Sequence, residues 1–202
     1  MNIISIYIMC LVTGYLFGSV MFAPIITRLV LHKDIRKLGN RNPGAANTFK
    51  NVGPFWGILT GVLDAAKAYL PLLAAHYFFG LNTVSLGLIG LGAIFGHGFP
   101  LYFGVKGGRS AGTIMGVFIF FIPYELLISF AVIPAFTFTL LKKNRSFCTP
   151  FGIIMLSILI ALFFRHSPQT KIMVLLSGFA GLFMNRYYLP IMISNLIKKG
   201  RG

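Results

Sequence analysis

Two glycine-containing basic stretches of this sequence have the residue types that bind phosphate. The first is DIRKLGNRNPGAANTFK, residues 34–50, and the second is GHGFPLYFGVKGGRSAGT, residues 96–113. In the second, Gly107 and Gly108 permit a close turn, and the residues from Ser110 onward can begin a helix whose first N–H groups lack partners. Lys106 and Arg109 would add positive charge to such an anion site. The alternative is that these glycines serve only close packing between membrane helices.

Three ionisable residues near these stretches are candidates for proton transfer or charge pairing. Asp64 and Lys67 are three residues apart and therefore share a helix face, so they predict either a functional pair or a buried structural ion pair. His97 precedes the glycine-rich stretch, either as an orienting or proton-handling group or as a histidine bonded to backbone at a helix end. No histidine is followed five residues later by Asp, so the H-x4-D catalytic pattern of acyl-CoA-type acyltransferases is absent.

The composition places these residues in a membrane protein. Of 202 residues, 56% are hydrophobic and 10% are charged, and the mean hydropathy is +0.83. A net charge of +15 often indicates nucleic-acid binding. Here membrane topology explains it more simply, since basic residues collect in the cytoplasmic connections beside membrane spans. Cys10 and Cys148 form no metal-ligand or redox spacing, so we assign them no chemistry.

The apolar runs predict an all-α, polytopic integral membrane protein with a single domain over residues 1–202. A spanning helix needs about 20 mostly apolar residues. On that basis about seven spans are predicted, at residues 3–27, 54–79, 83–103, 111–122, 124–141, 150–164 and 172–195. The division between the fourth and fifth rests on Pro123, which breaks a long apolar run beside Glu125.

The basic residues predict the orientation of these spans. With seven spans, the connections at 28–50, 104–110 and 142–146 and the C-terminal tail lie on one side and hold most of the Lys and Arg residues. The opposite connections hold only Arg165 and Lys171. The N-terminus is therefore predicted outside and the C-terminus in the cytoplasm, in the inner (plasma) membrane. The first run lacks a basic start and a cleavage site, so we expect a retained span.

Three segments together resemble the bacterial PlsY-type glycerol-3-phosphate acyltransferases. They are DIRKLGNRNPGAANTFKNVG, LDAAKAYLP and GHGFPLYFGVKGGRSAGT, and the likeness extends from about residue 14 to residue 116. Positions that match the first motif are Gly39, Asn42, Pro43, Gly44, Ala45 and Asn47. Asp64 and Lys67 match an LDxxKG pattern without its Gly. Positions that match the second motif are Gly96, His97, Lys106, Gly107 and Gly108.

The resemblance implies transfer of an acyl chain from acyl phosphate to glycerol 3-phosphate, giving 1-acylglycerol 3-phosphate and phosphate. The donor is already activated, so the expected partners are these two substrates and membrane lipid, with no cofactor, and the expected state is a monomer. His97, Asn40 and Arg109 are the implied catalytic residues. The implied substrate-binding residues are Lys50, Asn42, Gly44, Asn47, Lys106, Gly107, Gly108, Ser110, Asp64, Lys67, Asn185 and Arg186.

The chain departs from the family pattern at several of these positions. It has Asn40 where Ser is usual, Lys50 where Arg is usual, and Arg109 where Lys is usual in GGKG. The third motif, with a His, an Asn and a Glu, is replaced by NRYYLP, in which Asn185 and Arg186 are the stand-ins. These departures leave two alternatives open: a paralogue that binds phosphate or lipid without turnover, and a small anion transporter, for which we find no inverted repeat.

The charge distribution makes a testable prediction about topology. In variants without the native cysteines, a membrane-impermeant thiol reagent applied to intact cells should miss Arg41→Cys and Asn144→Cys and should label Pro168→Cys. The three variants labelled after lysis give the control for reactivity. Labelling of Arg41→Cys from outside would place the first basic stretch on the wrong side of the membrane.

Overall fold

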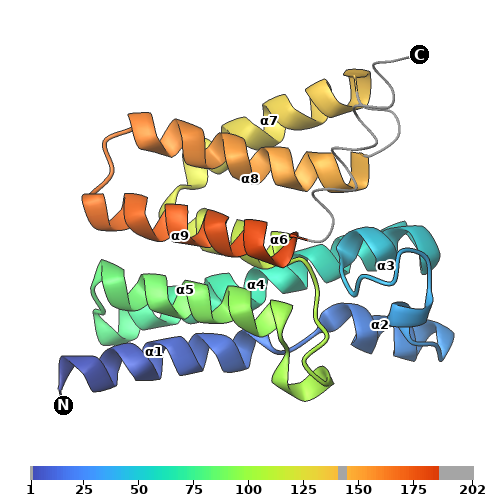
Figure 1. Cartoon of the computed structure of the whole chain (residues 1–202), viewed down its shortest axis with the longest axis horizontal. Helices are drawn as coiled ribbons and strands as arrows, with labels where there is room; N and C mark the ends of the chain where they lie inside the picture. The colour runs from blue at the N-terminus through green and yellow to red at the C-terminus, as the bar shows by residue number, and fades with distance from the viewer. Residues whose placement is uncertain (1, 141–144, 187–202) are drawn as a thin grey trace.

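The described part of the chain is helical throughout. The structure, a computed structural model, describes residues 2–140 and 145–186, and these form helices and no strand. The elements are α1 (Ile3–Gly18), α2 (Phe22–Leu31), η1 (Ile35–Lys37), α3 (Ala45–Asn51), α4 (Pro54–Phe79), α5 (Thr83–Gly98), η2 (Leu101–Phe103), α6 (Ala111–Phe121), α7 (Pro123–Leu140), α8 (Arg145–Phe163) and α9 (Pro168–Met184). In Figure 1, α1, α4 and α5 lie below α7, α8 and α9, and α2 and α3 lie together at one end.

The first predicted span, residues 3–27, lies within Ile3–Leu31, a stretch that can cross a membrane, but it is divided into two helices. α1 ends at Gly18 and α2 begins at Phe22. Pro24 explains the break, because proline has no N–H to donate to the carbonyl four residues earlier, which is that of Val20. Instead, the Lys67 ammonium from α4 donates to the Val20 carbonyl over 2.6 Å. A distant side chain therefore replaces the missing helical hydrogen bond.

Small residues bring α1 and α5 into backbone contact. Gly14 and Gly18 on α1 face Gly92 and Gly96 on α5, each pair four residues apart and thus on one helix face. A Cβ atom at Gly14 would lie 2.0 Å from the Ile89 carbonyl oxygen, and one at Gly96 would lie 2.2 Å from the Tyr15 carbonyl oxygen. The glycine-rich helix α5 is therefore packed closely against α1. This contact fixes α5, which carries His97 at its end.

The remaining predicted spans match helices of unequal length. By length and composition, Ile3–Leu31, Pro54–Phe79 and Thr83–Phe103 can each cross a membrane. α6 has 11 residues, and at about 1.5 Å per residue it is about 16 Å long, roughly half the hydrocarbon thickness. α7 and α8 correspond to the fifth and sixth predicted spans. α9 corresponds to the seventh, whose part beyond residue 186 lies outside the described residues. The number of spans and the sides of the termini remain predictions.

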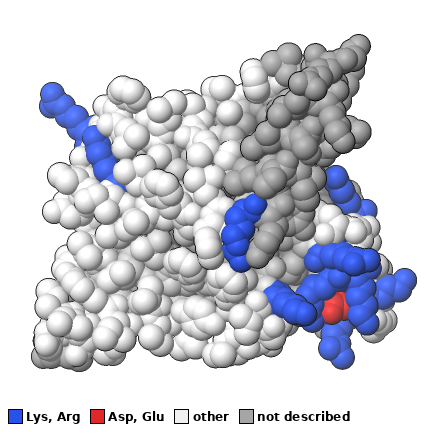
Figure 2. Space-filling model, in the orientation of Figure 1, with Lys and Arg blue, Asp and Glu red and all other residues white. Residues whose placement is uncertain are grey.

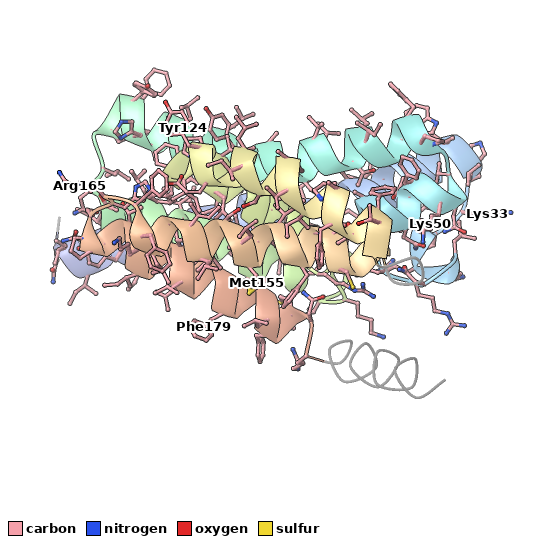
Figure 3. The ribbon with its side chains drawn as sticks, turned by 90° about the horizontal axis from the view of Figure 1, so that it is seen from above. Lys33, Lys50, Tyr124, Met155, Arg165 and Phe179 are labelled. Atoms are coloured by element: carbon pink, nitrogen blue, oxygen red, sulfur yellow. The ribbon has the colours of Figure 1, made fainter. Side chains whose placement is uncertain are left out.

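Basic side chains gather at one end of the molecule. On the face shown in Figure 2 most Lys and Arg atoms lie at the end formed by α2 and α3. Figure 3 places Lys33 and Lys50 at this end, and Tyr124 and Arg165 at the opposite end. The sequence predicted an unequal distribution of basic residues between the two sides of the membrane, and which end faces the cytoplasm remains a prediction.

A buried carboxylate joins α7 to the connection before α9. Glu125 is 1% exposed, and its Oε1 lies 2.6 Å from His166 Nε2. Glu125 marked only a span boundary in the sequence, and the partner, 41 residues away, was not foreseen. The contact explains how a carboxyl group, costly inside a membrane protein, is accommodated at the start of α7.

Removing His166, the partner of Glu125, should lower the stability of the fold. We expect His166→Ala to lower the free energy of unfolding by about 1–3 kcal/mol, because the Glu125 carboxyl group would lose its hydrogen bond in a buried position. Thermal unfolding of detergent-purified protein measures the effect. Gln169→Ala, at an exposed neighbouring position, serves as the control. Equal melting temperatures for the two variants would contradict the assigned role of His166.

Candidate functional site

One cavity brings the two basic stretches together with an apolar wall. Its volume is about 430 Å³. Polar and charged side chains reach it from the two loops, from α4 and from the ends of α5 and α9: Asn40, Asn42, Asp64, His97, Arg109, Ser110 and Asn185. Its apolar lining comes from α4, α6, α7, α8 and α9: Ile58, Val62, Ile114, Met115, Ile119, Phe130, Phe151, Ile154, Met155 and Leu182. The cavity can therefore receive a ligand that is polar at one part and aliphatic at another.

Asn47 organises the first loop from behind the cavity. Its buried side-chain amide donates to the carbonyl oxygens of Leu38, over 3.0 Å, and Ile35, over 3.3 Å. Its Oδ1 accepts from the Asn40 backbone N–H over 3.3 Å. Asn40 Oδ1 in turn accepts from the Asn42 N–H over 3.1 Å. Asn47, predicted as a binding residue, holds the loop and does not line the cavity, whereas Asn40, Asn42 and Gly44 do.

The glycine-rich loop folds back onto the end of α5. The Gly107 N–H donates to the Gly98 carbonyl over 3.2 Å, and the Gly108 N–H donates to the His97 carbonyl over 3.0 Å. A Cβ atom at Gly107 would lie 2.0 Å from the His97 carbonyl oxygen, and one at Gly108 would lie 2.3 Å from His97 Nε2. Both glycines are therefore required by close packing on α5. Neither lines the cavity; the next two residues, Arg109 and Ser110, do.

Ser110 turns the chain from this loop into α6. It has a left-handed backbone, with φ of 59°, and its Oγ donates to the Ile94 carbonyl over 2.9 Å. Among the described residues no side chain caps the N-terminus of α6, and Ala111 and Gly112 line the cavity. The first N–H groups of a helix carry partial positive charge, so this helix start is electrostatically suited to an anion, and the anion site itself remains a prediction.

Asp64, Lys67 and His97 form one buried cluster. Lys67 Nζ lies 3.0 Å from Asp64 Oδ1 and 2.8 Å from His97 Nδ1, and Asp64 Oδ1 lies 3.5 Å from His97 Nδ1. The structural ion pair anticipated from the spacing is present, yet Asp64 and His97 also line the cavity. The sequence had treated His97 separately, and the structure joins it to the pair through side chains.

Arg36 links the two loops. Its Nε donates to both Asp34 carboxylate oxygens over 3.1 Å, and its Nη1 donates to the Phe103 carbonyl over 3.0 Å. The hydrogen bond from Arg36 holds the pKa of Asp34 below its usual value. This contact fixes the first stretch against the beginning of the second. No sequence pattern indicated it, because 67 residues separate the two partners.

The other predicted residues divide between near and remote positions. Lys50 is exposed and lines a second hollow of about 560 Å³ that shares Ile58, Met115 and Phe130 with the cavity. Lys106 is exposed and lines neither. Arg186 is exposed, lies over the Phe183 ring and donates to its carbonyl, and does not line the cavity.

Asn185 is the stand-in that reaches the cavity. Its Nδ2 donates to the Gly181 carbonyl over 2.8 Å and lies 3.5 Å from the Arg109 carbonyl oxygen. Its Oδ1 is buried and has no hydrogen-bond partner in the described part of the chain. Of the two residues proposed to replace the third motif, Asn185 therefore belongs to the cavity and Arg186 does not.

The sequence reasoning missed the small residues that make room for the cavity. Gly61 and Ala65 on α4, Gly112 on α6, and Gly178 and Gly181 on α9 all line it. The spacing of four from Gly57 through Gly61 to Ala65 was a usable signal, because it places three small residues on one helix face. Within residues 2–140 and 145–186 no three His, Cys, Asp or Glu side chains are placed to hold a metal.

Comparison with known proteins identifies the family. A family model described as glycerol-3-phosphate acyltransferase matches residues 8–195. Glycerol-3-phosphate acyltransferase 1 of Dehalococcoides mccartyi is 32% identical over 177 residues, which cover 86% of this chain and 85% of that protein. Its namesake from Lactobacillus johnsonii is 40% identical over 111 residues, so the match covers 55% of this chain but only 54% of that relative's length.

A solved structure has the same fold. The crystal structure of PlsY, an integral membrane glycerol 3-phosphate acyltransferase, in its glycerol 3-phosphate form superposes with a TM-score of 0.83. The identity is 26%, and the match covers 94% of this chain and 92% of that one. Together with the apolar helices, these matches describe a multi-pass membrane protein. The chain belongs to the PlsY-type glycerol-3-phosphate acyltransferase family.

Proposed function

We propose that this protein transfers an acyl chain from acyl phosphate to glycerol 3-phosphate at the cavity, on the cytoplasmic side of the inner membrane, as a monomer. The observation that carries the proposal is the composition of the cavity wall. Arg109, Asn42 and Asn185 offer polar contacts, and residues of α4, α6, α7 and α8 offer aliphatic and aromatic ones. Both substrates carry phosphate, and only the donor carries a long chain, so the two kinds of lining suit this reaction.

The phosphate groups are assigned to the polar part of the wall. Arg109 supplies charge, the start of α6 supplies backbone N–H groups, and Asn42 and Asn185 supply amide groups. We assign Lys50, which lines the neighbouring hollow, to a second phosphate. The acyl chain would lie against Ile58, Val62 and Met115 and the apolar residues that face them.

The reaction requires positioning more than activation. The glycerol hydroxyl oxygen forms a bond to the acyl carbonyl carbon, the bond from that carbon to the phosphate oxygen breaks, and the departing phosphate accepts the hydroxyl proton. No cofactor takes part in this balance. The protein must hold two anions close together with the hydroxyl against the carbonyl, which is the contribution expected of fixed donors in a confined cavity.

Direct assay of purified protein tests the proposal. Phosphate release from acyl phosphate should depend on glycerol 3-phosphate, and acyl-CoA offered as the donor should give no product. A protein that is inert with every acyl donor but is protected against thermal unfolding by glycerol 3-phosphate would instead be a binding paralogue. Uptake of phosphate into vesicles without acyl transfer would indicate a transporter.

The packing of the glycine-rich loop predicts the effect of adding one methyl group. Gly108→Ala places a Cβ against His97 Nε2, so the loop that carries Arg109 must shift. We expect a loss of apparent affinity for glycerol 3-phosphate of at least about tenfold, or about 1.4 kcal/mol. Gly107→Ala should disturb the backbone pairing on α5 as well and should therefore also lower the melting temperature.

Gly80→Ala provides the matched control for these variants. Gly80 follows α4 and does not line the cavity, and a Cβ atom added to it would have no other atom within 4 Å. This control should cost stability through its positive φ while leaving affinity unchanged. Normal affinity in Gly108→Ala would show that the glycine serves packing alone.

The departures from the family pattern make a further prediction. If Asn40, Lys50 and Arg109 are adapted to one another, then the wild type turns over acyl phosphate, and Asn40→Ser, Lys50→Arg and Arg109→Lys each lower the rate. The physical reason is that Arg and Lys present different donor geometries to phosphate, and Asn40 Oδ1 already holds the Asn42 N–H. Phosphate release by the wild type, the three single variants and the triple variant separates adaptation from loss. An inactive wild type whose triple variant regains binding would contradict adaptation.

A further inference from the structure

We infer that Lys67 fixes His97 as a neutral imidazole with its proton on Nε2, so that His97 donates a hydrogen bond to a substrate oxygen and does not act as the base. The inference rests on the proposed function and defines one residue's part in it. It follows from the contacts on the two sides of the imidazole ring. Lys67 and Asp64 are positioning residues, because they act through His97.

The first side of the ring faces an ammonium group whose donors are all engaged. Lys67 Nζ has three N–H bonds. Its three near acceptors are the Val20 carbonyl oxygen at 2.6 Å, His97 Nδ1 at 2.8 Å and Asp64 Oδ1 at 3.0 Å. The neighbouring carboxylate favours the charged form of the lysine. An ammonium group can only donate, so Nδ1 must accept and must be unprotonated.

The competing arrangement has poorer geometry. A proton on Nδ1 would point toward either the Lys67 ammonium, which cannot accept it, or Asp64 Oδ1, which is 3.5 Å from Nδ1. At that distance the carboxylate is a weak acceptor. A doubly protonated ring would also bring a second positive charge within 2.8 Å of Nζ. The cluster therefore favours the neutral ring with an unprotonated Nδ1.

The second side of the ring carries Nε2 and lies beside the glycine-rich loop. His97 is one of the cavity-lining residues, and its Nε2 lies against Gly108, where a Cβ atom would come within 2.3 Å. In the described part of the chain, the side-chain hydrogen bond and ion pair of His97 both go through Nδ1, and neither involves Nε2. The proton on Nε2 is therefore free to meet an oxygen atom of a bound anion or of the acyl carbonyl. The charged groups around the ring are Asp64 and Lys67 from α4, and Arg109 lines the same cavity.

Nitrogen-15 NMR of histidine-labelled protein in detergent reads the tautomer directly. The wild type minus His97→Gln difference isolates the His97 signals from those of the other three histidines. We expect an unprotonated Nδ1 and a protonated Nε2 throughout pH 5.5–8, and a displaced Nε2 proton resonance on adding glycerol 3-phosphate but a smaller displacement with inorganic phosphate. A proton on Nδ1, or a ring that becomes doubly charged within this range, overturns the inference.

Lys67 variants test the positioning role. Lys67→Met should release the ring, so that His97 shows a mixture of tautomers or titrates, while Lys67→Arg keeps donors beside Nδ1 and should keep the Nε2–H form. A wild-type tautomer in a folded Lys67→Met protein would overturn the assignment to Lys67. If the Met variant does not fold, the wild-type spectrum and the His97 variants below still decide between donor and base.

Substitutions of His97 separate donor from base through activity. Gln can present an amide N–H near the position of Nε2, whereas the shorter Asn reaches only the position of Nδ1. We expect kcat/KM of His97→Gln within about tenfold of wild type, and losses of about 10²–10³-fold in His97→Asn and His97→Ala. Equal losses in all three, with a wild-type rate that falls as His97 is protonated, would identify a base. The NMR result does not need turnover, so the expected tautomer in an inactive protein would contradict the acyl transfer and not the donor role.

Discussion

The buried ammonium of Lys67 is the interaction on which the site depends. It replaces the hydrogen bond that Pro24 cannot give to Val20, pairs with Asp64 on its own helix, and holds the His97 ring at the end of α5. Because all three acceptors lie on different segments, one charge joins the α1–α2 break, α4 and α5. Leaving a buried charge without its partner typically costs several kcal/mol, so these segments are held together by a strong constraint.

The glycine-rich loop is positioned by that arrangement. The loop pairs with the carbonyl oxygens of His97 and Gly98, and it then delivers Arg109 and Ser110 to the cavity. The first loop is held by two other contacts: Asn47 accepts from the Asn40 N–H, and Arg36 donates to the Phe103 carbonyl in the second stretch. Small residues on α4, α6 and α9 leave space between these loops and the apolar helices. Small residue types therefore have two effects in this fold: between α1 and α5 they permit close packing, and here they leave a cavity.

Much of this arrangement could be predicted because its signals are local. The apolar runs indicated the helices. The two glycine-containing basic stretches predicted a shared anion site, and residues of both stretches line one cavity. Pro24 was also a local signal, and it was overlooked. Asn47 was assigned to the ligand because sequence does not reveal that its amide is already satisfied by backbone groups.

Other features depend on contacts between distant segments. The Glu125–His166 pair and the link from Arg36 to Phe103 join residues far apart in sequence, and no spacing rule predicts them. Asn185 and Arg186 are neighbouring polar residues, yet only Asn185 reaches the cavity, because the chain leaves α9 at this point and Arg186 lies over Phe183. Such choices are made by packing geometry.

The central claim is that the polar part of this cavity holds the phosphate of glycerol 3-phosphate, next to the apolar residues that would hold the acyl chain. An experimentally determined structure of the protein with glycerol 3-phosphate tests it most directly. The account predicts the phosphate between the Asn40–Asn42 segment and Arg109, within hydrogen-bond distance of the N-terminus of α6 and Asn185. A phosphate bound at the exposed Lys37 and Lys106, with the cavity empty, would contradict it.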